Sequence, residues 1–91
     1  MVQDKALVLK IITPDAVVFQ EHVQSVSLMG IQGSFGVLPG HAPFITQLKV
    51  APARTRVGDK ELVFSVRGGL CKVLDKHVTI LTDAAELVQK S

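Results

Sequence analysis

Apolar and polar residues alternate in short segments along most of the chain. Leu7, Leu9 and Ile11 stand at every second position, a spacing that places side chains on one face of a β-strand. Segments rich in β-forming residues recur at roughly ten-residue spacing, at 16–19, 23–29, 44–49, 54–57, 62–66, 70–74 and 77–82. They predict an all-β antiparallel sandwich, or flattened barrel, of about eight to ten short strands over residues 1–82.

Short turn-forming segments separate these expected strands. Thr13-Pro14-Asp15 follows the first of them, Gly58-Asp59 suits a tight hairpin, and Asp75-Lys76 suits a chain reversal. The Gly68-Gly69 pair is expected to begin a further turn before the next strand. The chain is therefore expected to reverse direction at each of these points.

Apolar residues also occupy positions on both faces of the expected strands, notably Val8, Ile12 and Val63. A single small core needs fewer apolar positions than this. Either two sheets share the core, or a partner covers one outer face. We therefore expect a contiguous apolar patch on one outer sheet face, because soluble monomers rarely expose such patches without a function.

The last nine residues change in character. Asp83-Ala84-Ala85-Glu86 has the form of a helix capping box, and most of the residues that follow favour helix. Residues 83–91 are therefore expected to begin a C-terminal helix that is either truncated or naturally short. Fewer than about twelve residues make only a marginal helix in isolation.

Composition narrows the class of protein. The chain has 91 residues, 47% of them hydrophobic and 20% charged, which excludes a disordered chain and indicates one domain. Its net charge of +2 and its lack of Trp and Tyr argue against nucleic-acid binding. No apolar run approaches the length of a membrane helix, so no membrane insertion is expected. The lone Cys71 fits a reducing compartment and a small buried apolar role.

The sequence offers no constellation for catalysis. His22, His41 and His77 lack metal-ligand spacing, and no glycine-rich phosphate loop precedes a helix. We therefore expect no enzyme activity, no metal and no cofactor.

One segment combines glycine and proline with apolar side chains. Such a mixture predicts a structured loop whose apolar residues are held against something. One interpretation is purely structural: a turn at the sheet edge whose apolar side chains pack into the core. The other is functional: a loop whose shape contacts a partner protein. The candidate site is Gly33, Ser34, Phe35, Gly36, Val37, Leu38, Pro39, Gly40, His41, Ala42 and Pro43.

This signature segment resembles the G-x-φ-G-φ-φ-P-G-H-A-P motif (φ apolar) of the epsilon subunit of F-type ATP synthases. Three more segments resemble that family in the same order. Residues 9–15 are similar to its opening strand followed by T-P-E, residues 66–69 to its V-S-G-G turn, and residues 78–86 to its V-T-V-L-A-D-T-A-E ending. The resemblance covers the chain from about Leu7 to Glu86.

The resemblance implies a non-catalytic central-stalk subunit of a proton-translocating F-type ATP synthase. Such a subunit contacts the gamma subunit and the c-ring, and couples rotation of the ring to gamma. In this family the segment matching Gly33 to Gly36 approaches the c-ring, and an acidic residue often stands where this chain has Ser34. The implied location is peripheral, at the cytoplasmic face of the bacterial inner membrane or at a chloroplast thylakoid.

The family's C-terminal helices carry its ATPase inhibition and, in some members, ATP binding. This chain stops where they would begin, so it is not expected to bind ATP. The alternative function is a stand-alone β-sandwich adaptor or ligand-binding module, which would need a concave pocket with convergent polar groups. A small enzyme is disfavoured by the missing catalytic groups. Binding to gamma would separate these functions.

Overall fold

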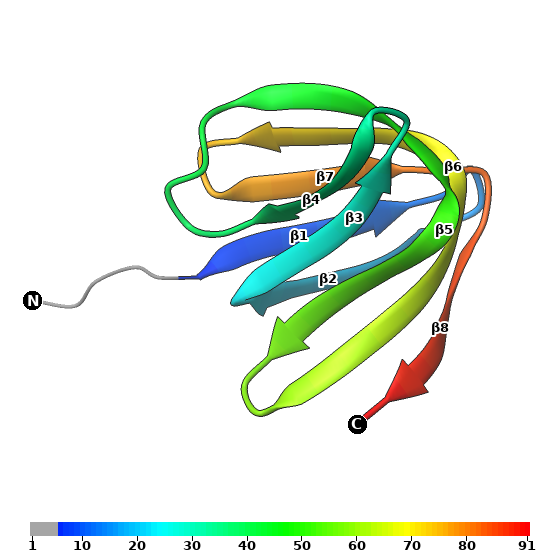
Figure 1. Ribbon diagram of the computed structural model, residues 1–91. Helices are drawn as coiled ribbons and strands as arrows, with labels where there is room; N and C mark the ends of the chain where they lie inside the picture. Colours follow the sequence, from blue (N-terminus) through cyan, green and yellow to red (C-terminus); the bar gives the residue numbers. More distant parts are fainter. Residues whose placement is uncertain (1–5) are drawn as a thin grey trace, which may run out of the picture.

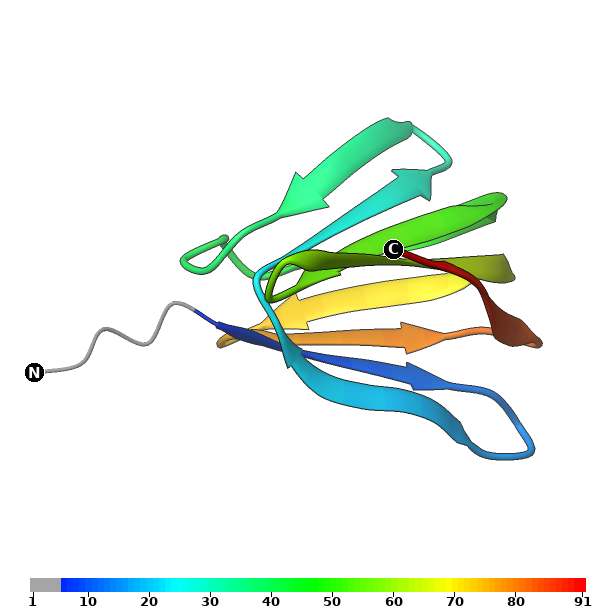
Figure 2. The same cartoon turned by 90° about the horizontal axis from the view of Figure 1, so that it is seen from below.

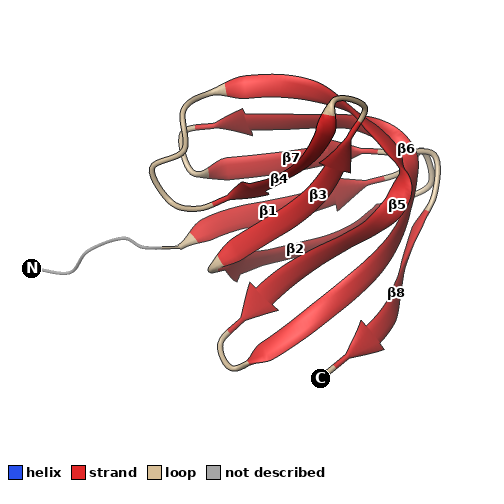
Figure 3. Cartoon of the chain, viewed as in Figure 1, coloured by secondary structure: helices blue, strands red, loops and turns tan. Residues whose placement is uncertain are grey.

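The computed structural model describes residues 6–91, and these form eight β-strands and no helix (Figures 1 and 3). The prediction of an all-β fold is confirmed. The strands are β1 (Leu7–Ile12), β2 (Val17–Val23), β3 (Ser25–Gly30), β4 (Gly33–Val37), β5 (Phe44–Val57), β6 (Lys60–Leu74), β7 (His77–Leu81) and β8 (Ala85–Lys90).

The strands form one continuous sheet that is rolled into two layers (Figure 2). The order is β2-β1-β7-β6-β5-β3-β4, and β8 pairs with β6 outside this path. The long strands β5 and β6 pair along nearly their whole length and bend together from one layer into the other (Figure 1). The first layer contains β2, β1, β7 and the second half of β6, whereas the second contains β4, β3, β8 and the first half of β6.

Strand β6 bends at Gly68-Gly69, where it changes its pairing partner from β8 to β7. Both glycines have positive φ, 76° and 108°, a region that favours glycine because it lacks a Cβ. The expectation that this pair begins a turn between two strands is wrong, because one strand continues through it. Strands that switch sheets at a bend are a known way to make a sandwich corner.

The other expected turns are confirmed. Gly58-Asp59 forms a two-residue connection that brings Val57 opposite Lys60. Asp75 and Lys76 both have positive φ, 50° and 68°, as a type I′ hairpin turn requires. Most strand pairs are antiparallel as predicted. The parallel pairing of β1 with β7 was not foreseen, because pairing between distant strands leaves no local sequence signal.

The core lies between the two layers and takes every second residue of the central strands. Its buried members include Leu7, Leu9 and Ile11 of β1, Val26 and Leu28 of β3, Phe64 and Cys71 of β6, and Val78 and Ile80 of β7. The ring of Phe19 on β2 packs edge-on against Phe64, with 4.9 Å between ring centroids. This interlayer contact joins the first layer to the second.

The predicted C-terminal helix is wrong. Residues 85–90 form strand β8, which pairs antiparallel with β6 from Leu62 to Val66. The edge of β6 pairs with every residue of the segment except Val88, where the register shifts, whereas a nine-residue helix would gain little from its own few turns. Just before this strand, the Oγ1 hydroxyl of Thr82 donates a hydrogen bond to the carbonyl oxygen of Ala84.

The sandwich is not a closed barrel, because β2 and β8 both have an unpaired outer edge. Phe19, Glu21, Leu62 and Leu87 line the opening between these two edges, together with Val57, Lys60 and Lys90. Residues 6–91 contain no helix long and apolar enough to cross a membrane.

Candidate partner-binding surfaces

The signature segment is half strand and half loop. Residues 33–37 form β4, an edge strand paired only with β3, and residues 38–43 connect it to β5. Val37 is fully buried and Phe35 is half-buried, whereas Leu38 is 62% exposed. The segment is therefore held against the domain by two of its three apolar residues.

A small aromatic cluster fixes the loop half of this segment. The ring of His41 lies 4.8 Å from that of Phe44, and Phe44 meets Phe35 edge-on at 5.2 Å between centroids. His41 Nδ1 donates to the carbonyl oxygen of Ala42 at 2.7 Å, and the His41 backbone N–H donates to that of Leu38. His41 therefore organises its own loop.

Two glycines of the segment have the left-handed backbone that only glycine adopts easily. These are Gly33, with φ of 135°, and Gly40, with φ of 92°. The φ of Gly36 is outside that region, and this residue lies within the extended strand β4. Gly33 and Gly40 are therefore the two positions in this segment where the backbone conformation requires glycine.

The far end of the β3–β4 hairpin is exposed. Ile31, Gln32, Gly33 and Ser34 all have exposed side chains or backbone there. The backbone N–H of Ile31 donates to the carbonyl oxygen of Gln47 on β5 at 3.0 Å, which ties the tip to the neighbouring strand. A depression of about 380 Å³ beside the tip is lined by Gln32, Ser34, Phe35, His41, Phe44 and Thr46, with Gly30, Gly33 and Ile45.

An apolar row crosses the outer face of the first layer. Strand register places Leu70 of β6 beside Leu81 of β7, Leu81 beside Ile12 of β1, and Ile12 beside Val17 of β2. Leu70, Leu81 and Val17 are 43%, 46% and 50% exposed. The expected apolar patch on one outer sheet face is therefore present, and a shallow depression of about 360 Å³ borders it at Thr13, Pro14 and Gly69.

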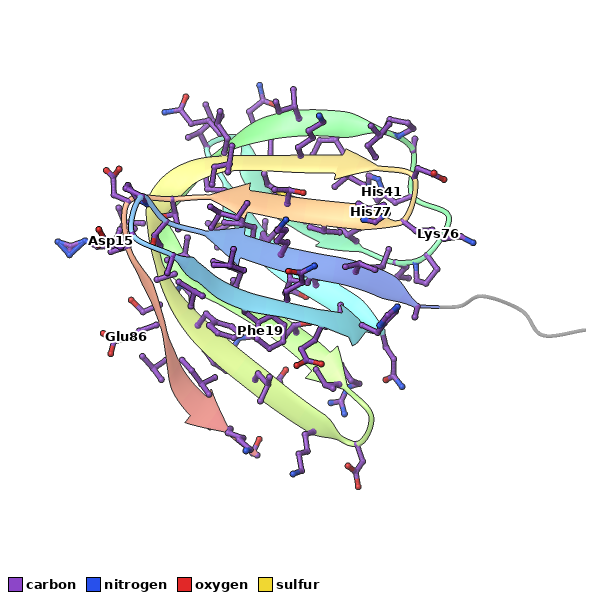
Figure 4. All side chains as sticks on the ribbon, turned by 180° about the vertical axis from the view of Figure 1, so that it is seen from behind. Asp15, Phe19, His41, Lys76, His77 and Glu86 are labelled. Atoms are coloured by element: carbon purple, nitrogen blue, oxygen red, sulfur yellow. The ribbon has the colours of Figure 1, made fainter. Side chains whose placement is uncertain are left out.

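Two further rows complete this surface, which we call the first-layer face. One row runs Ile45, Lys72, Thr79, Lys10 and Gln20, and the other runs Leu74, His77, Val8 and His22. Figure 4 looks onto this layer, with His41 and His77 toward one end and Asp15 at the other. The outward positions of these strands carry apolar groups, two lysines, two histidines and the neutral Thr79 and Gln20, and no carboxylate.

The outer face of the second layer has a different character. Its outward positions include Arg54, Arg56, Ser65, Glu86 and Gln89. Arg54 forms an ion pair with Glu61 at 3.7 Å. Exposed apolar residues such as Val88 also occur on this side. The two faces are therefore chemically distinct, and the first-layer face is the better candidate for burial against a partner.

The described residues offer no group of three or more His, Cys, Asp or Glu side chains placed to hold a metal ion. His22, His41 and His77 lie on β2, in the loop before β5 and on β7. Cys71 is fully buried, and this burial raises the pKa of its thiol to about 12, so it is not poised as a nucleophile.

Comparison with known proteins agrees with this geometry. Residues 6–88 match the family described as "ATP synthase, Delta/Epsilon chain, beta-sandwich domain". The chain is 40% identical over 82 residues to the ATP synthase epsilon chain of Brevibacillus brevis, covering 89% of this chain and 62% of that protein. It is 45% identical over 78 residues to the ATP synthase epsilon chain of Syntrophobacter fumaroxidans, covering 86% and 58%. The chain thus spans about three-fifths of the length of these relatives.

Solved structures have the same fold. A chain in the mitochondrial ATP synthase of Euglena gracilis, solved as OSCP/F1/c-ring, superposes with a TM-score of 0.85 at 27% identity, over 90% of this chain and 53% of that one. A chain in the central stalk and c-ring of the Tetrahymena thermophila enzyme superposes with a TM-score of 0.74 at 15% identity, over 88% and 65%, and this second likeness concerns the fold alone.

Proposed function

Since the chain belongs to the ATP synthase delta/epsilon β-sandwich family, we propose that it is a central-stalk subunit of a proton-translocating F-type ATP synthase. It binds the gamma subunit and the c-ring and couples rotation of the ring to gamma. It has no catalytic role and binds no ATP. It lies at the membrane as a peripheral part of the complex, on the cytoplasmic side in a bacterium.

The observation that carries this proposal is the apolar row of the first-layer face. This continuous apolar row crosses four strands, and three of its four residues are about half-exposed on the outer face of the sheet. Such surfaces mark protein–protein contacts. We assign this face to gamma. The fold supports the assignment mechanically, because a closely paired two-layer sheet is stiff enough to transmit torque.

The exposed tip of the β3–β4 hairpin and the following signature loop form the c-ring contact in this proposal. Ser34 stands at the tip where the family often has an acid, so the contact depends on hydrogen bonds and shape and not on that charge. Substitution of Gly40 tests this contact. Its φ is 92°, and a residue with a Cβ cannot adopt that value without backbone strain.

The test measures ATP-driven proton pumping beside ATP hydrolysis in reconstituted complexes. Gly40→Val is expected to lower pumping more than hydrolysis, because strain displaces the loop of residues 38–43 from the proposed c-ring contact while the catalytic head is untouched. Gly36→Val is the matched control, since its backbone is extended and only the Val26 carbonyl oxygen lies near, at 3.9 Å. Equal pumping-to-hydrolysis ratios in folded, assembled Gly40→Val and Gly36→Val complexes would contradict this role for the loop.

A direct binding experiment addresses the alternative of a stand-alone adaptor. The purified chain is expected to form a stable complex with gamma on size-exclusion chromatography. Failure of the folded chain to bind gamma would favour the adaptor function. Saturable micromolar binding of ATP in calorimetry would contradict the part of the proposal that excludes a nucleotide site.

A further inference from the structure

The first-layer face carries two lysines that have no acidic partner among residues 6–91. Lys10 on β1 and Lys72 on β6 both pair with Thr79 of β7, so they flank it on either side in the middle row. Neither lysine forms an ion pair within the described residues 6–91. Neighbouring strands lie about 4.8 Å apart, so the two lysine backbones are separated by about 10 Å.

The two lysines differ in exposure. Lys10 is partly exposed on β1, whereas Lys72 on β6 is exposed. Leu9 and Ile11, the strand neighbours of Lys10, point the other way into the core. The apolar row lies on one side of the lysines, and Leu74, His77 and Val8 lie on the other. A partner that covers both rows also covers the two ammonium groups.

The described outward positions of β1, β2, β7 and the second half of β6 carry no carboxylate, and acidic residues lie at the margin of this surface. Asp75 lines a depression of about 230 Å³ together with Lys72, Leu74, His77 and Thr79, but it belongs to the turn beyond the strand ends. Asp15 and Asp83 lie past the opposite ends of β1 and β7. Burying an unpaired charge in an interface is costly, whereas a hydrogen-bonded pair recovers much of that cost.

We propose that Lys10 and Lys72, whose backbones lie about 10 Å apart, select the partner of this face by pairing with two carboxylates. On this chain the lysines stand between the apolar row and the row of Leu74, His77, Val8 and His22. The proposal rests on the docking of gamma proposed above and adds the chemistry of the gamma surface. The two flanking rows supply the contact area, and the lysine pair fixes the register and rejects surfaces that carry cations at those points.

The first test is zero-length carbodiimide coupling of the complex with gamma, followed by peptide mass spectrometry. This reagent joins a lysine amine to a carboxylate that touches it. We expect isopeptide bonds from Lys10 and Lys72 to Asp or Glu of gamma. Lys60 and Lys90 line the opening between β2 and β8, outside the first-layer face, and serve as internal controls. Coupling through the control lysines alone, in a complex that has formed, overturns the proposal.

The second test measures affinity for gamma across ionic strength. The double variant Lys10→Glu with Lys72→Glu is expected to bind at least about tenfold more weakly than the wild type and to lose most of its salt dependence. Arg56→Glu with Arg67→Glu changes the net charge equally outside this face and is expected to stay within about threefold. Equal losses in the two folded double variants overturn the proposal, whereas absence of binding by the wild-type chain overturns the function on which it rests.

Discussion

At the scale of single residues, Cys71 shows how burial decides chemistry. Its side chain is fully enclosed on β6 and is a free thiol. Desolvation penalises the thiolate and raises the pKa from 9.0 to about 12. The residue contributes to the core as a small apolar group, as the lone cysteine in the sequence predicted.

The raised pKa of Cys71 predicts a loss of stability at alkaline pH. The unfolded chain releases this proton near pH 9.0 and the folded chain near 12, so the contribution is complete below pH 9.0 and is lost as the pH rises toward 12. The slope from this group approaches about 1.4 kcal/mol per pH unit. Urea unfolding of the wild type and of Cys71→Ala, measured from pH 8 to 11, should show the steeper decline in the wild type. Parallel curves would contradict this linkage.

At the scale of elements, the bend of β6 determines how the sheet becomes a sandwich. A Cβ added at Gly69 would overlap the carbonyl oxygen of Leu81 and would lie 2.9 Å from the Leu81 carbonyl carbon and the Thr82 Cα. These obstacles are backbone atoms of the strand that β6 pairs with next. The sequence suggested the glycine pair as a turn, but its true role depends on β7 and could not be predicted from local residues.

Gly69→Ala is therefore expected to destabilise the fold severely, by about 3 kcal/mol or more, because both the φ of 108° and the steric overlap oppose it. Gly40→Ala is the matched control. It has a positive φ as well, but nothing lies within 4 Å of the added Cβ, so a cost of about 1–2 kcal/mol is expected. Chemical denaturation gives both values. Comparable losses in the two variants would mean that the Leu81 backbone can move aside.

Strand β8 illustrates the limit of local propensity. Alanine, glutamate and leucine at 85–87 favour helix in isolation, yet the unpaired edge of β6 converts the same residues into a strand. Backbone NMR shifts of residues 85–90 should be strand-like, with amides bonded to β6 protected from exchange. Helical shifts over this range would restore the prediction that the structure overturned.

At the scale of the whole molecule, the two faces of the sandwich are set by strand register. The alternation of Leu7, Leu9 and Ile11 with Val8, Lys10 and Ile12 was evident in the sequence, so the core side of β1 could be predicted. Which outward residues become neighbours could not be predicted, because Ile12 meets Leu81 only through a parallel pairing across some seventy residues of chain. The apolar row exists only in the assembled sheet.

Leu81 lies at the centre of that row, between Leu70 and Ile12. Leu81→Asn keeps the side-chain size and the net charge but places an amide where gamma is proposed to cover an apolar surface. Loss of one well-packed anchor typically weakens an interface on the order of tenfold or more. Stability should change little, since the side chain is 46% exposed and points away from the core.

The matched control is Val88→Asn on β8, which is 57% exposed outside the first-layer face. It makes the same kind of exchange from an apolar group to an amide and should leave gamma affinity within about twofold, because a residue outside the interface contributes little to binding. Calorimetric titration of gamma with the two folded variants measures both affinities directly. If Val88→Asn weakens binding as much as Leu81→Asn does, the apolar row is not the docking surface. If only Val88→Asn weakens it, gamma covers the second layer, and the chemistry assigned to the first-layer face must serve another contact.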